Sequence, residues 1–584
     1  MNAYSIRYAI LLRRLCVWFP PGLGLAGLAL VALQCAGQMP PPGGPIDTTP
    51  PTIVWTSPDP YTLHFEGQEI GLEFDEYVDR NSVQNAVFIS PDVGPLTFNW
   101  SGHEVTIGFE DTLRRNTTYV VTVGTDVVDL HNRNRMAHAF ALAFSTGGTI
   151  DPGFIQGKVY PIEGGDELSG IMVFAYRLAP GEADTLNAMW TKPDYATQSG
   201  VDGSFELAHL ALGAYRLVAV KDQYRNLLYD PEADQFGVPA YGLSLTTEDT
   251  LLTHVTMQLA LEDTTAPRLI KVSPLTRRLL KEEFSEAIDS GSVHLRNVIV
   301  LDTLSGARIP VLSARVLFPK QTEIMVATEP MDSGRGYRAV VSGVWDLAGN
   351  TISTLADAMP FTAVDSLDTS AVDVKSVSVQ DSSLDLSLQP SVVAVWTRPL
   401  ARPLDPDVVS MTDSSGRTVP LRISRQSNIA LEVGPLRDLA GKTWYILRIH
   451  GGRVRDVFGG VGKDTVRVIR FQTLDPDALS SIEGTVADER ESDAIGPIHV
   501  RAEEVSGPTA TEMEVILPAA GVFTLPQIRE GRYVLSAYRD RNDNGMFDPG
   551  RVYPFEPSER FVVYADTLTV RARWPLEGVV LRLR

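Results

Sequence analysis

Apolar residues along much of this chain alternate with polar ones, which is the pattern of β-strands with one buried and one solvated face. The alternation is clearest at residues 70–74, 105–109, 384–388, 429–433 and 445–449. Glycine, proline, asparagine and aspartate interrupt the strand-like stretches at short intervals, as the turns of antiparallel sheets require. Long stretches with helical periodicity are scarce. The pattern predicts an all-β protein in which each of these stretches buries one face.

A first repeated unit, which we call type A, recurs along the chain. Residues 47–51 read Asp-Thr-Thr-Pro-Pro, and residues 263–267 read Asp-Thr-Thr-Ala-Pro. A third copy is more divergent and carries Arg398 where the other two have a glutamate. Each unit has about the length of an immunoglobulin-like sandwich. The first two copies share a strand ending in Phe-x-Glu, a later tyrosine and an aspartate turn: Phe74 to Glu76, Tyr119 and Asp129, then Phe284 to Glu286, Tyr337 and Asp346.

A second repeated unit, type B, occurs twice and is interleaved with the first. Its copies align without a gap over residues 203–230 and 521–548. Both copies contain Gly-x-Phe and then Gly-x-Tyr, followed by matching aspartates at Asp222 and Asp540. Because the copies match over their length, we expect two modules of the same fold.

These repeats divide the chain into β-modules in the order A-B-A-A-B. We predict a string of antiparallel β-sandwich modules, joined by short segments near Thr149, Asp263, Asp365 and Ser480. The whole chain should be elongated, because each sandwich buries its own core and meets mainly its neighbours. The predicted ranges are 51–148 (module A1), 149–262 (B1), 263–364 (A2), 365–479 (A3) and 480–584 (B2).

The repeat motifs resemble known families. Type A, with its Thr-Pro-Pro opening, Phe-x-Glu and the Asp-Leu-Ala-Gly-Asn of residues 346–350, resembles the SbsA-type bacterial Ig-like domain. Type B is similar to the transthyretin-like domain of carboxypeptidase regulatory regions. The combination resembles Ig-like-domain lipoproteins of Bacteroidota. The resemblance implies β-sandwich folds and an envelope location, but sandwiches of this class have many functions.

The N-terminal segment resembles the signal of a bacterial lipoprotein. Arginines at positions 7, 13 and 14 precede an apolar stretch at 23–33. Gln34 and Cys35 follow this stretch, and a proline-rich tether comes next. We expect residues 1–34 to be a signal peptide and residues 35–50 to be a lipidated cysteine with its semi-rigid tether. Gln34 departs from the small residue that such signals have before the cysteine. An ordinary cleaved signal and an uncleaved anchor are the alternatives.

Composition excludes one class of partner and points to export. The chain has 584 residues and a net charge of −21, which argues against nucleic acid because phosphate binding needs clustered lysine and arginine. It has two cysteines, Cys16 inside the expected signal and Cys35. An exported chain with one remaining thiol cannot rely on internal disulfides, and that thiol fits the acylation site.

One loop in B2 is a candidate calcium site. Asp540, Asn542, Asn544 and Asp548 place oxygen ligands at alternate positions around Gly545, and Ca²⁺ prefers such oxygens on a tight turn. The EF-hand pattern fails at its last position, and an ordinary Asn-Gly turn is the alternative. The equivalent B1 loop keeps its aspartates but lacks the glycine, so we expect weaker binding there.

The sequence shows neither a nucleophile elbow nor a His-Glu-x-x-His motif. We therefore expect no catalytic residues and no required cofactor, with Ca²⁺ as the candidate ion. The expected function is that of an exported, non-catalytic envelope lipoprotein with a structural, adhesive or binding role, in the outer membrane and facing the periplasm or the surface. Its expected partners are the membrane, through the lipid, and an unknown protein or glycan. The alternative is an accessory or hydrolytic envelope protein that acts on glycan or peptide in a cleft between domains.

Overall fold

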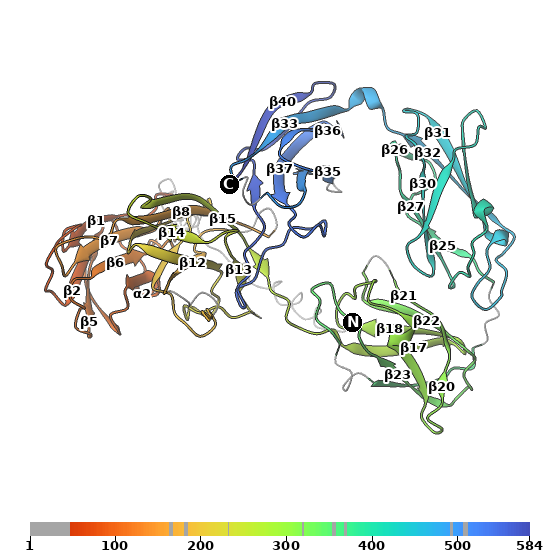
Figure 1. Cartoon of the computed structure of the whole chain (residues 1–584), viewed down its shortest axis with the longest axis horizontal. Helices are drawn as coiled ribbons and strands as arrows, with labels where there is room; N and C mark the ends of the chain where they lie inside the picture. Colours follow the sequence, from red (N-terminus) through yellow and green to blue (C-terminus); the bar gives the residue numbers. More distant parts are fainter. Residues whose placement is uncertain are drawn as a thin grey trace, which may run out of the picture.

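The computed structural model describes ten β-sheets, two within each of the five predicted module ranges (Figure 1). The described residues are 47–162, 167–179, 185–231, 233–317, 320–352, 358–366, 371–490, 494–505 and 512–584. The expected signal peptide, Cys35 and most of the tether lie outside these residues. Among the described residues, no helix is long and apolar enough to cross a membrane.

Module A1 is a sandwich of the sheets β1-β2-β5-β4 and β3-β6-β7. Its one α-helix begins after Asp79, whose carboxylate accepts hydrogen bonds from the backbone N–H groups of Asn81 and Ser82, the usual role of an N-cap residue. The elements are β1 (Ile53–Ser57), β2 (Glu69–Phe74), α2 (Arg80–Ala86), β3 (Val87–Ser90), β4 (Leu96–Ser101), β5 (Glu104–Phe109), β6 (Thr118–Val123) and β7 (Phe140–Ser145).

Module B1 combines the sheet β10-β9-β12-β13-β16, with β14 also paired to β12, and the sheet β11-β8-β15. The strands are β8 (Gly153–Tyr160), β9 (Met172–Leu178), β10 (Tyr195–Gln198), β11 (Ser204–Leu210), β12 (Gly213–Val220), β13 (Gln235–Gly237), β14 (Leu243–Leu245), β15 (Leu251–Gln258) and β16 (Ala260–Leu261).

Module B2 repeats this plan with the sheets β35-β34-β37-β38, joined by β39, and β36-β33-β40. Its strands are β33 (Ser480–Asp488), β34 (Ile498–Glu504), β35 (Glu512–Leu517), β36 (Gly521–Ile528), β37 (Gly531–Arg539), β38 (Phe561–Val563), β39 (Leu568–Val570) and β40 (Leu576–Leu583).

Modules A2 and A3 are each a sandwich of two four-stranded sheets. The elements of A2 are β17 (Leu269–Thr276), β18 (Leu279–Phe284), η1 (Leu295–Asn297), β19 (Val298–Asp302), β20 (Arg308–Ile309), β21 (Val311–Val316), β22 (Glu323–Thr328), β23 (Gly336–Val341) and β24 (Ala358–Thr362). Those of A3 are β25 (Val374–Val377), β26 (Ser383–Leu386), β27 (Val392–Trp396), η2 (Pro406–Val408), β28 (Val409–Asp413), β29 (Leu421–Arg425), β30 (Ala430–Pro435), β31 (Trp444–His450), η3 (Gly451–Arg453) and β32 (Val466–Thr473), and η4 (Pro476–Ala478) follows.

The all-β prediction is confirmed, and each module has its own buried apolar cluster. Four of the five alternating stretches bury their apolar face as predicted, as Ile70, Leu72 and Phe74 do. The fifth is different because β26 is irregular: Leu384 is 58% exposed, and Asp385 has φ +58° beside a shift in strand register. The sheets are mostly antiparallel, but β15–β8, β26–β32 and β33–β40 pair in parallel.

Contacts join A1 to B1, A2 to A3 and A3 to B2. Between A1 and B1, the Gln198 amide accepts a hydrogen bond from the backbone N–H of Asp126 at 3.1 Å and donates one to its carboxylate at 3.2 Å. Between A2 and A3, the Phe458 ring packs on the outer face of β18 and β22. Between A3 and B2, the Arg573 guanidinium donates to the Asp477 carbonyl at 2.7 Å.

The last module also contacts B1, which is not its neighbour in sequence. Val552 of B2 is buried in an apolar cluster of B1 residues, and Tyr160 of B1 lies 5.3 Å from Phe561 of B2 between ring centroids. In Figure 1 the loop of B2 between β37 and β38, which contains Val552, reaches down beside β13. Modules B1, A2, A3 and B2 therefore close into a ring. The expectation of an elongated string in which modules meet mainly their neighbours is wrong, because an apolar contact joins modules far apart in sequence.

Candidate functional site

The predicted calcium ligands of B2 come together in one tight turn after β37. Asp540 is fully buried, and its two carboxylate oxygens accept hydrogen bonds from the backbone N–H groups of Asn544 at 3.1 Å and Gly545 at 2.7 Å. The Asn542 amide donates to Asp548 at 2.7 Å, and the Asn544 amide donates to it at 3.2 Å. Gly545 has φ +77°, which favours glycine. The four side chains therefore line one small polar loop, and their oxygens are of the type that Ca²⁺ prefers.

Glu559 completes this loop and is not evident from the sequence motif. It is 3% exposed and accepts hydrogen bonds from the backbone N–H groups of Arg541 at 2.6 Å and Asp548 at 3.2 Å. Burial raises the pKa of Glu559 to about 7, with a smaller upward contribution from the charges of Asp548 and Asp540 that opposes the lowering effect of the two backbone hydrogen bonds. Its distance along the chain from Asp540 hides it from any local pattern.

The equivalent loop of B1 adopts the same turn without a glycine. Asp222 accepts hydrogen bonds from the backbone N–H groups of Asn226 at 3.3 Å and Leu227 at 2.9 Å, and Leu227 takes φ +60°. The Asn226 amide donates to Asp230 at 2.9 Å. Asp234, which is fully buried, holds the place that Glu559 has in B2. The missing glycine thus strains one residue but does not change the loop's shape.

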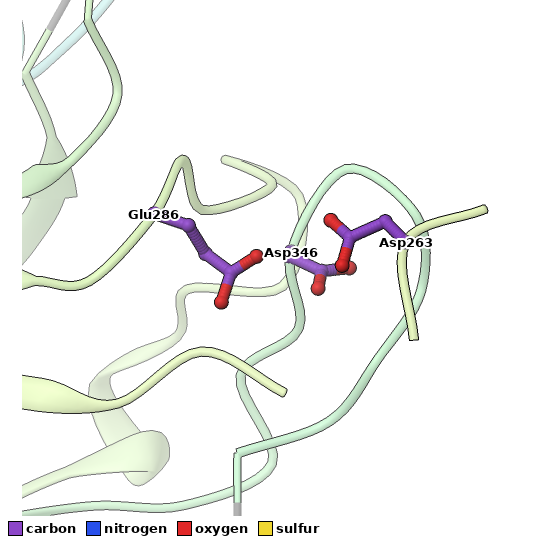
Figure 2. Close-up of side chains that lie close together, drawn as sticks. All are labelled: Asp263, Glu286 and Asp346. Atoms are coloured by element: carbon purple, nitrogen blue, oxygen red, sulfur yellow. The ribbon is translucent and has the colours of Figure 1, made fainter. Parts of the chain in front are cut away.

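A second cluster of carboxylates lies at one end of A2 (Figure 2). Each of Asp263, Glu286 and Asp346 contributes a carboxylate oxygen, and these three oxygens lie within 4.8 Å of one another. They come from the segment before β17, the turn after β18 and the turn after β23. Asp346 is 2% exposed and accepts hydrogen bonds from the backbone N–H and side-chain amide of Asn350 at 2.8 and 3.0 Å. Burial first, and then the charges of the two aspartates, raise the pKa of Glu286.

The same three positions differ among the A modules. In A1, burial and then the charges of Asp129 and Asp47 raise the pKa of Glu76. In A3, Arg398 replaces the glutamate, and its Nη1 atom lies 3.2 Å from Oδ2 of Asp456, whose side chain is fully buried. The third module thus places a guanidinium where A1 and A2 place a carboxylate. These residues recur as motifs of the type A repeat, and their repeated spacing is the sequence signal that could have grouped them as one site.

The contact between B1 and B2 forms a cleft between β8 and β15 of B1 and β38 and β40 of B2. Its volume is about 640 Å³, and the described residues that line it include His254, Lys158, Arg582 and Tyr160 but no aspartate or glutamate. The hydrolytic alternative needs a carboxylate pair or an acid–base group in such a cleft. This lining supplies neither a carboxylate pair nor a histidine with a carboxylate partner.

Comparison with known proteins identifies part of the chain. Three solved structures are similar at low level. The N-terminal part of the bacterial S-layer protein SbsC has 13% identity and a TM-score of 0.17, with 36% of this chain and 45% of that chain covered. The native conformation of E. coli alpha-2-macroglobulin has 10% identity and a TM-score of 0.14, and the match covers 90% of this chain and 34% of that chain. The Mycobacterium tuberculosis L,D-transpeptidase 1 has 14% identity and a TM-score of 0.13, and the match covers 26% of this chain and 76% of that chain.

The chain thus spans under half of the SbsC fragment and about a third of the macroglobulin. Similarities this low carry no argument about function. No curated protein sequence matches the chain. Residues 47–146 match the family described as bacterial Ig-like domain, which confirms the Ig-like resemblance for module A1.

Proposed function

We propose that this protein is a structural or adhesive component of a bacterial cell envelope, held to a membrane by a lipid on Cys35. One observation carries the proposal: the described chain is built of β-sandwich modules that each have a core and are joined by packed contacts. Such a chain holds surfaces at fixed positions relative to one another. The bacterial Ig-like match of residues 47–146 supports an envelope location.

The partner is proposed to be a glycan or protein of the envelope, bound by surfaces that the modules present. The net charge of −21 supports a partner other than nucleic acid, because an acidic surface repels phosphates.

The anchor is tested by Cys35→Ser in cells that produce the full chain. Since one thiol would carry the lipid, the variant should leave the membrane fraction and lose incorporation of labelled fatty acid. Cys16→Ser, inside the expected signal, is the matched control and should change neither readout. Membrane partitioning that is unchanged in Cys35→Ser, without label in the parent, would contradict lipidation and favour an uncleaved anchor.

We also propose that Ca²⁺ binds the Asp540 loop of B2 and stabilises that module. The convergence of Asp540, Asn542, Asn544 and Asp548 around one turn supports the proposal, together with the buried carboxylate of Glu559 beside them. Two aspartates and a glutamate at close range repel one another, and a bound cation would reverse this effect.

A further inference from the structure

Module B2 carries seven residues that B1 lacks, at one point in the repeat. Strand register fixes the comparison, since β13 and β38 pair with equivalent residues of β12 and β37. Asp234 of B1 and Glu559 of B2 therefore occupy the same position, two residues before the paired Phe236 and Phe561. Three residues separate Asp230 from Asp234, whereas ten separate Asp548 from Glu559. The insertion thus lies within residues 549–558, which we call the latch.

The latch leaves its own module and packs on the outer sheet face of B1. Val552 is 2% exposed and belongs to a buried cluster whose other fully buried members come from B1. Phe555 packs against the same cluster, and the Arg216 guanidinium of B1 lies 3.8 Å from its ring centroid. The buried members that B1 contributes are Met172, Phe174, Tyr176, Ala188, Ala196, Val218, Val220, Tyr229, Phe236 and Val238.

The latch holds its own shape and is supported at its edges. Arg551 and Glu556 exchange two backbone hydrogen bonds of 2.9 and 3.0 Å, which close the loop that presents Val552 and Phe555. Around this contact, the Arg490 guanidinium of B2 lies 3.5 Å from the centroid of the Tyr241 ring of B1. A loop closed in this way loses little conformational freedom when it docks.

The acceptor face is apolar in B1 and polar in B2. By strand register, Phe174, Val218 and Val220 of B1 correspond to Arg501, Ser536 and Tyr538 of B2. Arg501 pairs with Glu514 at 2.7 Å on that face of B2. Val552 and Phe555 of the latch complete this apolar face, to which B1's own loop residues such as Tyr229 also contribute. Both halves of the contact, the insertion and the apolar face, therefore occur once in the described repeats.

We propose that the outer face of B1 is a docking surface for the latch of B2, and that this docking holds B1, A2, A3 and B2 in a closed ring. Without it, the modules open into a longer chain that bends at the segment around Asp263 between B1 and A2. The proposal deepens the envelope function, on which it rests for its biological meaning: the latch sets how far the modules reach from the membrane.

The decisive experiment shortens the latch to the length found in B1. In residues 47–584, the ten residues between Asp548 and Glu559 are replaced by Pro-Glu-Ala, the sequence of residues 231–233. B1 spans the same strands with three residues, so B2 should still fold. Small-angle scattering should show a larger radius of gyration, and spin labels at cysteines placed at Val201 and Trp574 should move apart. Both positions are exposed, and the native cysteines lie before residue 47.

Point variants separate docking from folding. Val552→Asp with Phe555→Asp should lower the ratio of closed to open chains by about tenfold or more, because the buried Val552 side chain alone contributes about tenfold or more and the partly buried Phe555 adds to it. Val522→Asp in the same module, at a side chain that is 76% exposed, is the matched control and should leave scattering unchanged. Unchanged scattering and label distances in both latch variants, with B2 folded by circular dichroism, would overturn the proposal. This result is independent of whether Cys35 is lipidated.

Discussion

Glu282 is a buried acid without a partner, and replacing it should stabilise module A2. The residue lies on β18 between Leu280 and Phe284, which face the core of A2. It is 0% exposed, and neither carboxylate oxygen has a hydrogen-bond partner among the described residues. The equivalent positions in the other A modules are Leu72 and Ala394, both buried and apolar. An uncharged side chain therefore fits this place in the fold.

The size of the effect follows from the pKa. Burial raises the pKa of Glu282 from 4.5 to about 8, so the folded protein keeps the proton at pH 7 while the unfolded chain releases it. At pH 7 this proton uptake costs about 3 kcal/mol of folding stability, at 1.36 kcal/mol for each pKa unit. Glu282→Gln should regain about this amount, and Glu282→Leu somewhat more, because an unsatisfied polar group costs about 1–3 kcal/mol when buried.

The pH dependence has a definite sign. Between pH 4.5 and about 8 the folded state binds the proton that the unfolded state has lost, so the stability of A2 falls as pH rises. The gain from Glu282→Gln should be near zero below pH 4.5, grow by about 1.4 kcal/mol per pH unit and level off above pH 8. Below pH 4.5 both states hold the proton, and above pH 8 both have lost it.

The assay is pulse-labelling hydrogen exchange of the intact chain in a denaturant series at several pH values, with labelling at one constant pH. Peptides from β18 and β22 then report the unfolding of A2 alone. Glu283→Gln changes the next residue, which is half-buried on the opposite side of the strand, and is the matched control. A gain from Glu282→Gln that does not vary with pH, or a loss of stability, would refute the reasoning that Glu282 is a neutral, unpartnered acid in the folded state.

Two further predictions concern the charged positions of the repeats. Arg398→Met should destabilise A3 by about 3–5 kcal/mol in a denaturant series, because Asp456 would stay buried without its cation. Arg402→Met, at an exposed side chain, is the control and should change the stability of A3 little. An equally small effect of Arg398→Met would show that the ion pair does not hold A3 together. Millimolar Ca²⁺ should raise the melting temperature of the transition assigned to B2, compared with the same protein in chelator. Asp540→Ala should abolish that shift, whereas Asp222→Ala should leave it unchanged. Identical melting curves of the parent protein with Ca²⁺ and with chelator would leave the loop as an ordinary polar turn.

Local patterns in the sequence predicted the strands well, because burial on one face produces period-two alternation wherever a strand is regular. Residues 70–74 and 445–449 are examples. The failure at Leu384 comes from β26, where Ser382 and Asp385 take positive φ and the strand pairs in parallel with a register shift. Alternation assumes an extended backbone, so it cannot show where that backbone turns.

The candidate sites were predicted only in their local part. Asp540 to Asp548 are close in sequence, and their spacing alone suggests a turn lined with oxygens. Glu559 is brought to them by β38, and the trio of A2 is brought together by three separate segments. The ring was missed because its two halves, an insertion in B2 and an apolar face on B1, have meaning only when the modules meet. Hydrophobic patterning shows that a face is buried and does not show what covers it.

Comparing equivalent positions shows that the modules of one type are not interchangeable. The position of Glu286 in A2 is an arginine in A3, so the same turn is acidic in one module and holds an internal ion pair in the other. The position of Phe174 in B1 is Arg501 in B2, so the same sheet face is covered in one module and polar in the other. These two differences lie at a module end and on an outer sheet face. The apolar face of B1 receives Val552 of B2, whereas the matching face of B2 carries the Arg501–Glu514 ion pair, so the two copies of type B differ where the ring contact forms.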